Sequence, residues 1–223
     1  MGKMQSSGKV VLFDIDYTLF DTSRFRDKLY EELSSLPGIS GATVEEIGTR
    51  AYQNVRKELG YFNPEEFIQE LSKGLNGIVS AEDIKRSIWS EGKFKECLYD
   101  ETIPVLIALE KVATIGIFSK GHDLFQRSKL NQIAHFFDEQ HIHIAVNKDI
   151  MFEKVLKKYQ GEKLFLVDDA LDILHKAKNL REDIVTVWVK RGIFAAVQKP
   201  IPGFEPNVTV ENLRGIEKII DRN

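Results

Sequence analysis

Short apolar runs alternate with helical repeats along the second half of the chain. Amphipathic stretches with a helical period cover residues 123–136, 149–159 and 170–180. Alternation of this kind predicts an α/β fold with a doubly wound parallel sheet, in which the carboxyl ends of the strands share one edge. The runs expected to form buried strands are rich in Val, Ile and Phe and cover residues 9–13, 112–118, 141–146, 164–167 and 184–189.

The interval between the first two predicted strands contains only helical patterning. We therefore expect an all-helical insertion at residues 21–100, which splits a Rossmann-like core made of residues 1–20 and 101–223. A further strand is expected at Val208–Val210. The predicted helices cover residues 23–36, 43–59, 64–75 and 81–89, and their expected starts are Thr22 or Ser23, Thr43 with Glu46, Asn63 before Pro64, and Ser80.

Polar side chains with compatible chemistry stand at the ends of the predicted strands. Any one of them is weak evidence, because strand ends are commonly polar. Their convergence on one edge of a parallel sheet is much harder to explain by chance. The set consists of Asp14 and Asp16 after the first strand, Ser119 with Lys120 and Gly121 after the second, Lys148 after the third, and Asp168 with Asp169 after the fourth.

Asp14 and Asp16 raise a question of electrostatics. Residues i and i+2 of a strand point the same way, so the two carboxylates are expected to lie near each other. Two like charges at such a short distance destabilise each other. A cation or a chemical role has to offset that cost. Clustered carboxylates with few strong bases nearby form an oxygen-ligand site of the kind that Mg²⁺ uses together with water and a substrate phosphate. The sequence therefore predicts Mg²⁺ at this edge.

Other chemistries are not indicated. Cys97 is the only cysteine, so no internal disulfide can form, and a packing role is expected for it. The five histidines are scattered, which argues against a tetrahedral zinc site. His141 and His143 share a strand face, and a structural or surface role is expected for them. The sequence contains no G-x-S-x-G elbow and no Gly-rich phosphate loop.

The composition limits the kinds of molecule that the protein is expected to bind. The chain of 223 residues has 31 Lys and Arg against 34 Asp and Glu, a net charge of −3, and no basic block that would favour nucleic acid or an anionic membrane. No apolar run reaches the roughly 18 residues needed to span a bilayer, and the N-terminal residues lack a signal-peptide core. A soluble, cytoplasmic protein is expected, and the sequence indicates no oligomeric state.

The motif D-x-D-x-T (Asp14, Asp16 and Thr18), followed in order by a serine, a lysine and an acidic pair, resembles the four motifs of the haloacid dehalogenase superfamily. The resemblance covers essentially the whole chain, and the insertion is similar to the helical cap of that superfamily's first structural subclass. Lys120 stands where Asn is common. The lysine segment is shorter than the usual K-P-D-P form, so Lys154 is an alternative to Lys148.

The resemblance implies a Mg²⁺-dependent phosphatase that hydrolyses a small phosphorylated metabolite. Asp14 would attack phosphorus and become an aspartyl phosphate, while Asp16 would protonate the leaving oxygen and then activate water. Lys148 is expected to hold Asp14 and the phosphate together and to keep Asp14 ionised.

The resemblance also implies the binding residues. The expected metal ligands are Asp14, Asp16 through its backbone carbonyl, and Asp168 or Asp169, with Asp169 favoured because it aligns with the Asp of the usual Gly-Asp pair. Phosphate binding is expected from Thr18, Ser119, Lys120 and Gly121, with Thr18 also bonding within the turn.

Other functions stay open. A phosphomutase uses the same residues. A 2-haloacid dehalogenase typically lacks the second acid, which is present here as Asp16. A non-catalytic phosphate-binding protein is the remaining alternative. In the insertion, Arg24, Arg26 and Lys28 either meet an anionic substrate or form a solvated helix face.

Overall fold

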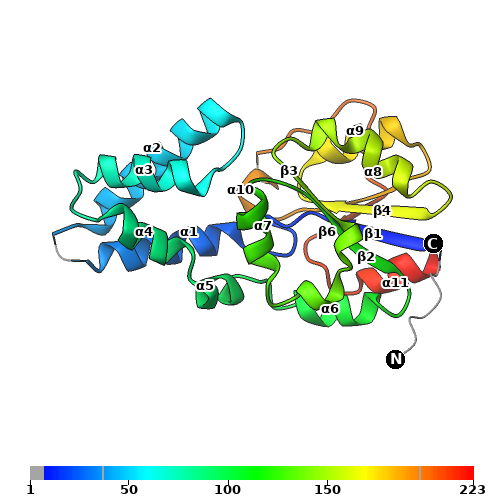
Figure 1. Ribbon diagram of the computed structural model, residues 1–223. Helices are drawn as coiled ribbons and strands as arrows, with labels where there is room; N and C mark the ends of the chain where they lie inside the picture. The colour runs from blue at the N-terminus through cyan, green and yellow to red at the C-terminus, as the bar shows by residue number, and fades with distance from the viewer. Residues whose placement is uncertain (1–7, 37, 196) are drawn as a thin grey trace.

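A six-stranded parallel sheet forms the centre of the computed structural model, which describes residues 8–36, 38–195 and 197–223 (Figure 1). The strand order is β3-β2-β1-β4-β5-β6, so the predicted α/β doubly wound parallel sheet is confirmed. The strands are β1 (Lys9–Phe13), β2 (Thr114–Lys120), β3 (Ile142–Ala145), β4 (Lys163–Asp168), β5 (Val185–Val189) and β6 (Val208–Val210).

The first strand lies inside the sheet between β2 and β4, which explains why its residues after Lys9 are all apolar and buried. Phe13 is level with Ile117 of β2 and with Val167 of β4. The amide of Asp14 continues this pairing by donating to the Val167 carbonyl at 2.9 Å. The register therefore brings the residue after β1 beside the end of β4.

Alternate residues of β1 point to opposite faces of the sheet, as the period of a strand requires. Val10 and Leu12 pack in one apolar cluster, which includes α8 (Phe152–Lys158) and α9 (Leu171–Leu180). Val11 and Phe13 pack in a second cluster. Helices α6 (Thr102–Leu109) and α11 (Ile216–Arg222) lie on the opposite side of the sheet from α8 and α9 (Figure 1).

The first five helices of the described chain follow β1 in the sequence and extend away from the sheet (Figure 1). Asn63 and Ser80 cap α3 and α4 as predicted. The capping residues predicted for α1 and α2 are wrong. The caps are Asp21 and Ser40, whose side chains accept hydrogen bonds from the backbone amides of Arg24 and Thr43. The five are α1 (Thr22–Ser34), α2 (Gly41–Leu59), α3 (Pro64–Gly74), α4 (Ala81–Ile88) and α5 (Glu91–Glu96).

Helix α7 (Asp123–Leu130) is shorter than the helix predicted over residues 123–136, because the chain continues through turns and a separate 3₁₀ turn at Ala134–Phe136. Another 3₁₀ turn, Lys148–Ile150, precedes α8 and delays its start. The sequence interpretation assigned no element to α5, α6, α10 (Gly192–Ala195) or α11.

Aromatic side chains join α7 to the five helices. The ring of Phe125 on α7 lies 5.8 Å from Phe25, 5.1 Å from Phe62, 5.8 Å from Trp89 and 5.7 Å from Phe94, measured between centroids. These residues belong to or pack against one apolar cluster that continues into the sheet. The position of α7 therefore depends on both parts of the molecule.

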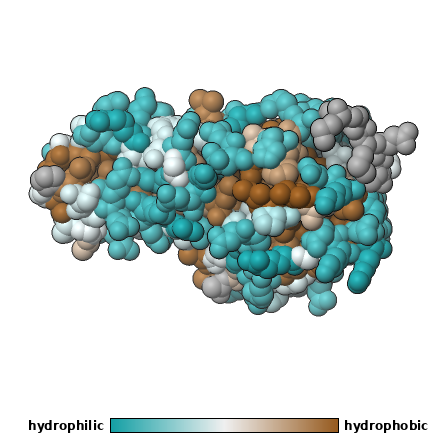
Figure 2. All heavy atoms as spheres, turned by 90° about the horizontal axis from the view of Figure 1, so that it is seen from below, coloured by the Kyte–Doolittle hydropathy of each residue, from teal (hydrophilic) through white to brown (hydrophobic). Residues whose placement is uncertain are grey.

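The surface leaves some apolar side chains uncovered. Seen from below, apolar side chains appear both over the part that contains the sheet and at the far end of the helical part (Figure 2), and Ile103 and Ile107 of α6 are exposed. Within the described ranges, no helix combines the length and the apolar character needed to cross a membrane.

Candidate active site

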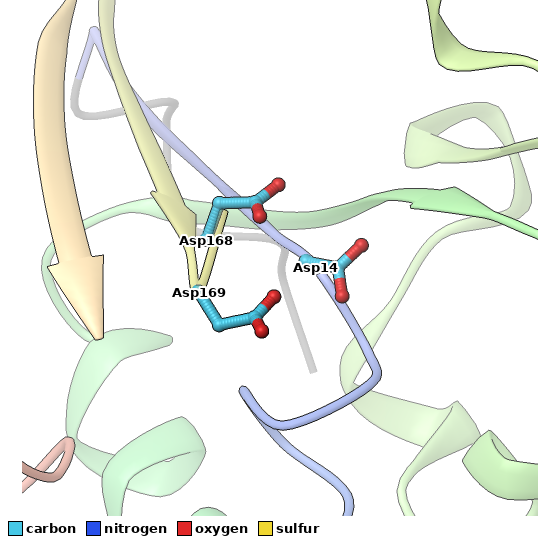
Figure 3. A group of neighbouring side chains, drawn as sticks. All are labelled: Asp14, Asp168 and Asp169. Atoms are coloured by element: carbon cyan, nitrogen blue, oxygen red, sulfur yellow. The ribbon is translucent and has the colours of Figure 1, made fainter. Parts of the chain in front are cut away.

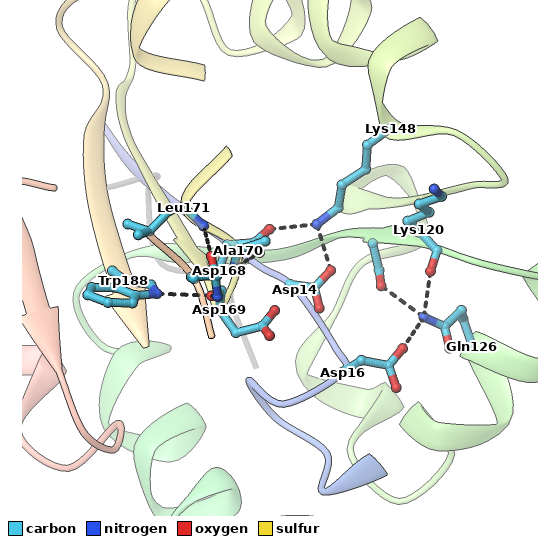
Figure 4. A network of polar contacts seen from close by, with 12 residues as sticks. Asp14, Asp16, Lys120, Gln126, Lys148, Asp168, Asp169, Ala170, Leu171 and Trp188 are labelled. Atoms are coloured by element: carbon cyan, nitrogen blue, oxygen red, sulfur yellow. Dashed lines mark hydrogen bonds and ion pairs between the residues drawn. The ribbon is translucent and has the colours of Figure 1, made fainter. Parts of the chain in front are cut away.

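A tight turn directly follows β1 and separates the two acids of the first motif. The Ile15 carbonyl accepts the amides of Thr18, Leu19 and Phe20 at 3.3, 3.0 and 2.9 Å. Tyr17 adopts a left-handed backbone with φ of 57°, which costs about 1 kcal/mol for a residue with a side chain. Because the chain reverses here, the Asp14 and Asp16 carboxylates enter different hydrogen-bond networks (Figure 4).

Asp14 belongs to a buried cluster of three acids. One carboxylate oxygen each from Asp14, Asp168 and Asp169 lies within 4.8 Å of the others (Figure 3). Lys148 reaches this cluster from the turn after β3, with Nζ 2.6 Å from Asp14 Oδ1 and 2.6 Å from Asp168 Oδ2. Three potential negative charges therefore surround one positive charge away from solvent.

The electrostatics of this cluster show a deficit of positive charge. Burial raises the pKa of Asp14 to about 7, and Asp168 and Asp16 add to the rise while Lys148 opposes it. Burial raises the pKa of Asp169 to about 9, with further contributions from Asp168 and Asp14. Lys148 favours the ionised form of Asp14 but desolvation has the larger effect in the metal-free chain, and the expectation that Lys148 keeps Asp14 ionised stays a prediction.

Lys148 is correspondingly a fully charged group. Burial acts to lower its pKa, but the Asp14 and Asp168 carboxylates raise it well above its usual range. Lys154, the sequence alternative, is exposed on α8. The structure therefore brings Lys148, and not Lys154, to the acids.

The three carboxylates suit a hard divalent cation. All the donor atoms are oxygens, and a charge of +2 would balance the excess negative charge of the cluster. Asp168 already accepts from Lys148 and from the Ala170 amide at 2.9 Å. The Asp169 carboxylate has no hydrogen bond or ion pair with the described residues, while its carbonyl accepts from Trp188 and Gln198. Asp169 is thus the acid with the freer oxygens.

The Asp16 carboxylate lies outside this cluster and accepts hydrogen bonds from three donors. Lys129 Nζ lies 2.6 Å from Oδ1, Gln126 Nε2 lies 2.8 Å from Oδ2, and the Thr22 hydroxyl donates to Oδ1. Burial acts to raise the pKa of Asp16, but Lys129 and the hydrogen bonds outweigh it and lower the pKa. The Asp16 side chain is therefore occupied by protein donors, and the metal-binding role expected for its backbone carbonyl stays a prediction.

Ser119 and Gly121 lie close to the Asp16 network. Ser119 is fully buried in β2, and its Oγ accepts from Gln126 Nε2 at 3.0 Å. A Cβ at Gly121 would stand 2.8 Å from Cγ of Gln126, so glycine leaves the space that this side chain occupies. The phosphate-binding roles expected for both residues stay predictions.

Thr18 and Lys120 differ in exposure. Thr18 is fully buried, and its Oγ1 has no hydrogen-bond partner among the described residues, so the local bond expected from this hydroxyl is wrong. The Lys120 side chain is exposed at the end of β2, and desolvation and the charge of Arg56 lower its pKa. Lys120 is therefore accessible to a ligand.

The cations predicted in the insertion are largely neutralised. Arg26 pairs with Asp27 at 2.7 Å, and Lys28 pairs with Glu96 at 2.6 Å. These contacts favour the solvated helix face over a substrate-binding role.

The remaining candidates are structural, as expected. His141 Nδ1 and His143 Nε2 lie 3.0 and 2.8 Å from the Tyr159 hydroxyl, and burial lowers the pKa of His143 to about 4. Cys97 is buried, and burial raises its pKa to about 11.

Sequence reasoning missed Thr22, Gln126 and Lys129. Thr22 was taken only as a possible helix start. Gln126 and Lys129 lie three residues apart on α7, in a stretch interpreted only as amphipathic. The available signal was that both adjoin apolar residues of the helix, Gln126 beside Phe125 and Lys129 beside Leu130, where buried polar side chains need partners.

Comparisons with known proteins identify the fold. No family model matches the sequence, and no curated protein sequence matches it. Among solved structures, one described as a haloacid dehalogenase-like hydrolase of Burkholderia xenovorans LB400 is 23% identical, with a TM-score of 0.78 and 95% of each chain covered.

Two other solved structures agree with this likeness. The HAD-hydrolase YfnB of Bacillus subtilis, bound to magnesium, is 16% identical with a TM-score of 0.65, and the match covers 96% of this chain and 98% of that one. L-2-haloacid dehalogenase of Xanthobacter autotrophicus, with chloropropionic acid covalently bound, is 12% identical with a TM-score of 0.60, covering 95% and 97%. The chain therefore has the fold of the haloacid dehalogenase-like hydrolases.

Proposed function

We propose that the protein is a Mg²⁺-dependent phosphatase that hydrolyses a small phosphorylated metabolite through an aspartyl phosphate on Asp14. The observation that carries this proposal is that the two acids directly after β1 have different surroundings. Asp14 lies among Asp168, Asp169 and Lys148, and a second acid, Asp16, stands apart from them. Phosphoryl transfer needs a nucleophile, neutralisation of charge on the phosphoryl oxygens and a proton carrier.

The residues divide the reaction as follows. A carboxylate oxygen of Asp14 attacks phosphorus while the bond to the leaving oxygen breaks, and Asp16 gives that oxygen a proton. Water then attacks the aspartyl phosphate, Asp16 takes the proton, and inorganic phosphate leaves Asp14 free again. The lowered pKa of Asp16 favours the carboxylate that takes the proton from water in the second step, and the proton taken there is the one that Asp16 gives to the leaving oxygen in the next turnover.

The remaining groups bind and neutralise charge. Ser119 donates to a phosphoryl oxygen, and Lys148 stabilises charge on Asp14 and on the phosphoryl group. Lys120 and the backbone near Gly121 contribute to phosphate binding. Asp14, Asp169 and the Asp16 carbonyl would hold Mg²⁺, with Asp168 beside them. When bound, Mg²⁺ supplies charge stabilisation for the phosphoryl oxygens. The Mg²⁺-bound fold neighbour supports this choice of cation.

Helices α1 to α5 would act as the cap that selects the substrate and excludes water from the site. The hydrophobic continuity through Phe125 indicates that this cap is packed against the sheet part in the state described. We place the active site in a core of residues 1–20 and 101–223 and the cap in residues 21–100.

Carbon–halogen hydrolysis is the second candidate, because several fold neighbours are named L-2-haloacid dehalogenases. The presence of Asp16 favours phosphate chemistry, since a proton carrier is required at that position for a phosphate ester. A phosphomutase would use the same groups and differ in the acceptor of the phosphoryl group.

The test is a turnover assay with Mg²⁺ on p-nitrophenyl phosphate and on a panel of phosphorylated metabolites, run beside 2-chloropropionic acid. We expect phosphate release that EDTA abolishes, and no chloride release. Sugar phosphates that change isomer without releasing phosphate would indicate a mutase. Turnover that persists unchanged in EDTA would contradict the metal requirement.

The variant Asp14→Asn tests the nucleophile. Activity should fall by about 10³-fold or more, because loss of a nucleophile removes the covalent route. Thermal unfolding should show a folded protein, since the substitution removes one acid from a cluster with excess negative charge. Asp221→Asn, on the exposed surface of α11, is the matched control. Near-normal kcat in Asp14→Asn would exclude covalent catalysis at this residue.

A further inference from the structure

The face of α7 that points toward the sheet carries two polar residues with no role in the scheme above. Gln126 and Lys129 are three residues apart and therefore lie on one side of the helix. Both are buried, at 2% and 4% relative exposure. Buried polar groups of this kind need specific partners, and here the partners are reacting residues.

Lys129 has its charge matched by Asp16. Its Nζ lies 2.6 Å from Asp16 Oδ1, and Asp16 is the only acid with which Lys129 forms an ion pair in the described part of the chain. The ammonium also lies over the rings of Phe125 and Phe20, 4.7 and 5.3 Å from their centroids. An apolar residue of similar size would fill this space without desolvating a charge. Stability alone therefore gives no reason for a lysine here.

Gln126 connects the second acid to the phosphate-binding hydroxyl. Its Nε2 donates to Asp16 Oδ2 at 2.8 Å, to Ser119 Oγ at 3.0 Å and to the Lys120 carbonyl at 3.0 Å (Figure 4). Because the amide is the donor to Ser119, the Ser119 oxygen acts as the acceptor, and its own hydrogen stays available for a ligand. A single side chain thus orients both groups.

The surroundings keep this arrangement in register. Gly121 leaves room for Gln126, since a Cβ there would stand 2.8 Å from Gln126 Cγ and 2.9 Å from Cδ. The next residue toward the N-terminus, Phe125, is held by aromatic rings from the five-helix segment. Helix α7 can therefore neither rotate nor shift without disturbing packing on both sides.

We propose that Gln126 and Lys129 form a clamp on α7 whose role is to position the Asp16 carboxylate and the Ser119 hydroxyl for phosphoryl transfer. The inference rests on the proposed function, because it assigns these two residues to the same site. Both are positioning residues, since they act through Asp16 and Ser119 and not on the substrate itself.

The experiment is a double-mutant cycle on kcat and KM for p-nitrophenyl phosphate with Mg²⁺, using Lys129→Met and Asp16→Asn. Lys129→Met should lower kcat by about 10- to 100-fold and change KM by less than about twofold, because it misplaces a proton carrier without altering substrate contacts. In the Asp16→Asn background the same substitution should change kcat by less than about twofold. Lys129→Arg, which keeps the charge, should recover part of the loss.

Arg127→Met is the matched control on the same helix. Arg127 forms exposed ion pairs with Asp123 and Glu139 and does not contact Asp16. The kcat of the Arg127→Met variant should therefore stay within about twofold of the wild type. Gln126→Leu tests the second half of the clamp and should raise KM as well as lower kcat, because Ser119 loses the partner that orients its hydroxyl.

Several results would overturn the clamp. One is a Lys129→Met enzyme with wild-type kcat, and another is an equal loss of kcat with and without Asp16. If Lys129→Met does not fold, the Lys129→Arg and Gln126→Leu variants decide the matter by the same parameters. A crystal structure of Lys129→Met with the Asp16 carboxylate unmoved would also refute it, independently of activity. Wild-type protein without phosphate release would instead refute the proposed function, and the clamp with it.

Discussion

Two acids that are two residues apart, Asp14 and Asp16, occupy opposite electrostatic environments. Asp14 shares a buried space with Asp168 and Asp169 and a single cation, Lys148, and its pKa rises to about 7. Asp16 has a cation of its own and two further donors, and its pKa falls below the usual value. Asp14 is buried and the Asp16 side chain is 28% exposed, and desolvation acts to raise the pKa of both acids, so the opposite directions come from the balance of charges and donors around each one.

This contrast shows how one strand end can serve two chemical purposes. The side of Asp14 lacks positive charge, which a metal ion and a phosphate-bearing substrate can use. The Asp16 carboxylate needs no further cation, because Lys129, Gln126 and Thr22 already donate to it. The first environment is suited to binding a cation, and the second to holding a proton carrier in place.

The largest effect is expected from removing the cation on the Asp14 side. Lys148→Met leaves three buried acids without an ion pair, which should lower activity by about 10²-fold or more and destabilise the metal-free protein by about 3 kcal/mol. Turnover and urea unfolding measure the two effects.

Mg²⁺ should restore part of the stability lost in Lys148→Met, because it supplies positive charge to the same acids. Lys154→Met is the control, since Lys154 is exposed on α8 and should leave both quantities unchanged. A Lys148→Met protein as stable as the wild type in EDTA would show that the cluster tolerates its excess charge.

A smaller effect is expected from pH. In EDTA, folded Asp14 keeps its proton up to about pH 7, whereas in the unfolded chain the acid loses it near its ordinary value of 3.8. The folded state therefore binds more protons in this window, and its stability falls as pH rises, on the order of 2 kcal/mol between pH 5 and pH 7.

The measurement is the urea midpoint at several pH values for the wild type and Asp14→Asn. Taking the difference between the two proteins cancels the contribution of His143, whose lowered pKa acts with the opposite sign. Asp16 should also show the opposite sign, because its lowered pKa contributes stability that is lost only as pH falls through its ordinary range. A difference that does not change with pH would mean that folding does not raise the pKa of Asp14.

The smallest effect concerns one donor on the Asp16 side. Thr22→Val removes the hydroxyl that donates to Asp16, which should cost about 1 to 2 kcal/mol of stability and lower kcat about two- to fivefold. Thr22→Ser keeps the hydroxyl and should resemble the wild type in thermal unfolding and in turnover. Equal behaviour of the Val and Ser variants would show that Lys129 and Gln126 suffice to hold Asp16.

The two parts of the molecule were predictable to different degrees. In the sheet part, the strands could be located from their composition, and the acids after β1 and β4 were expected together because parallel strands end at one edge. In the helical segment, the helices were expected from their period, but two of the four starts were wrong. Several side chains can cap a helix start equally well in sequence, and the backbone at Asp21 and Ser40 decides which one does.

The sequence by itself determined the sheet and the meeting of Asp14, Lys148, Asp168 and Asp169, since the alternation of strands and helices and a period of two residues are local properties. Only the tertiary structure decided that the turn at Tyr17 separates Asp16 from Asp14 and that Lys129 and Gln126 reach Asp16 from more than 100 positions away. The physical reason is that such contacts depend on how α7 is rotated against the sheet. That rotation is set by Phe125 and its aromatic neighbours on other elements, which no local pattern in the sequence specifies.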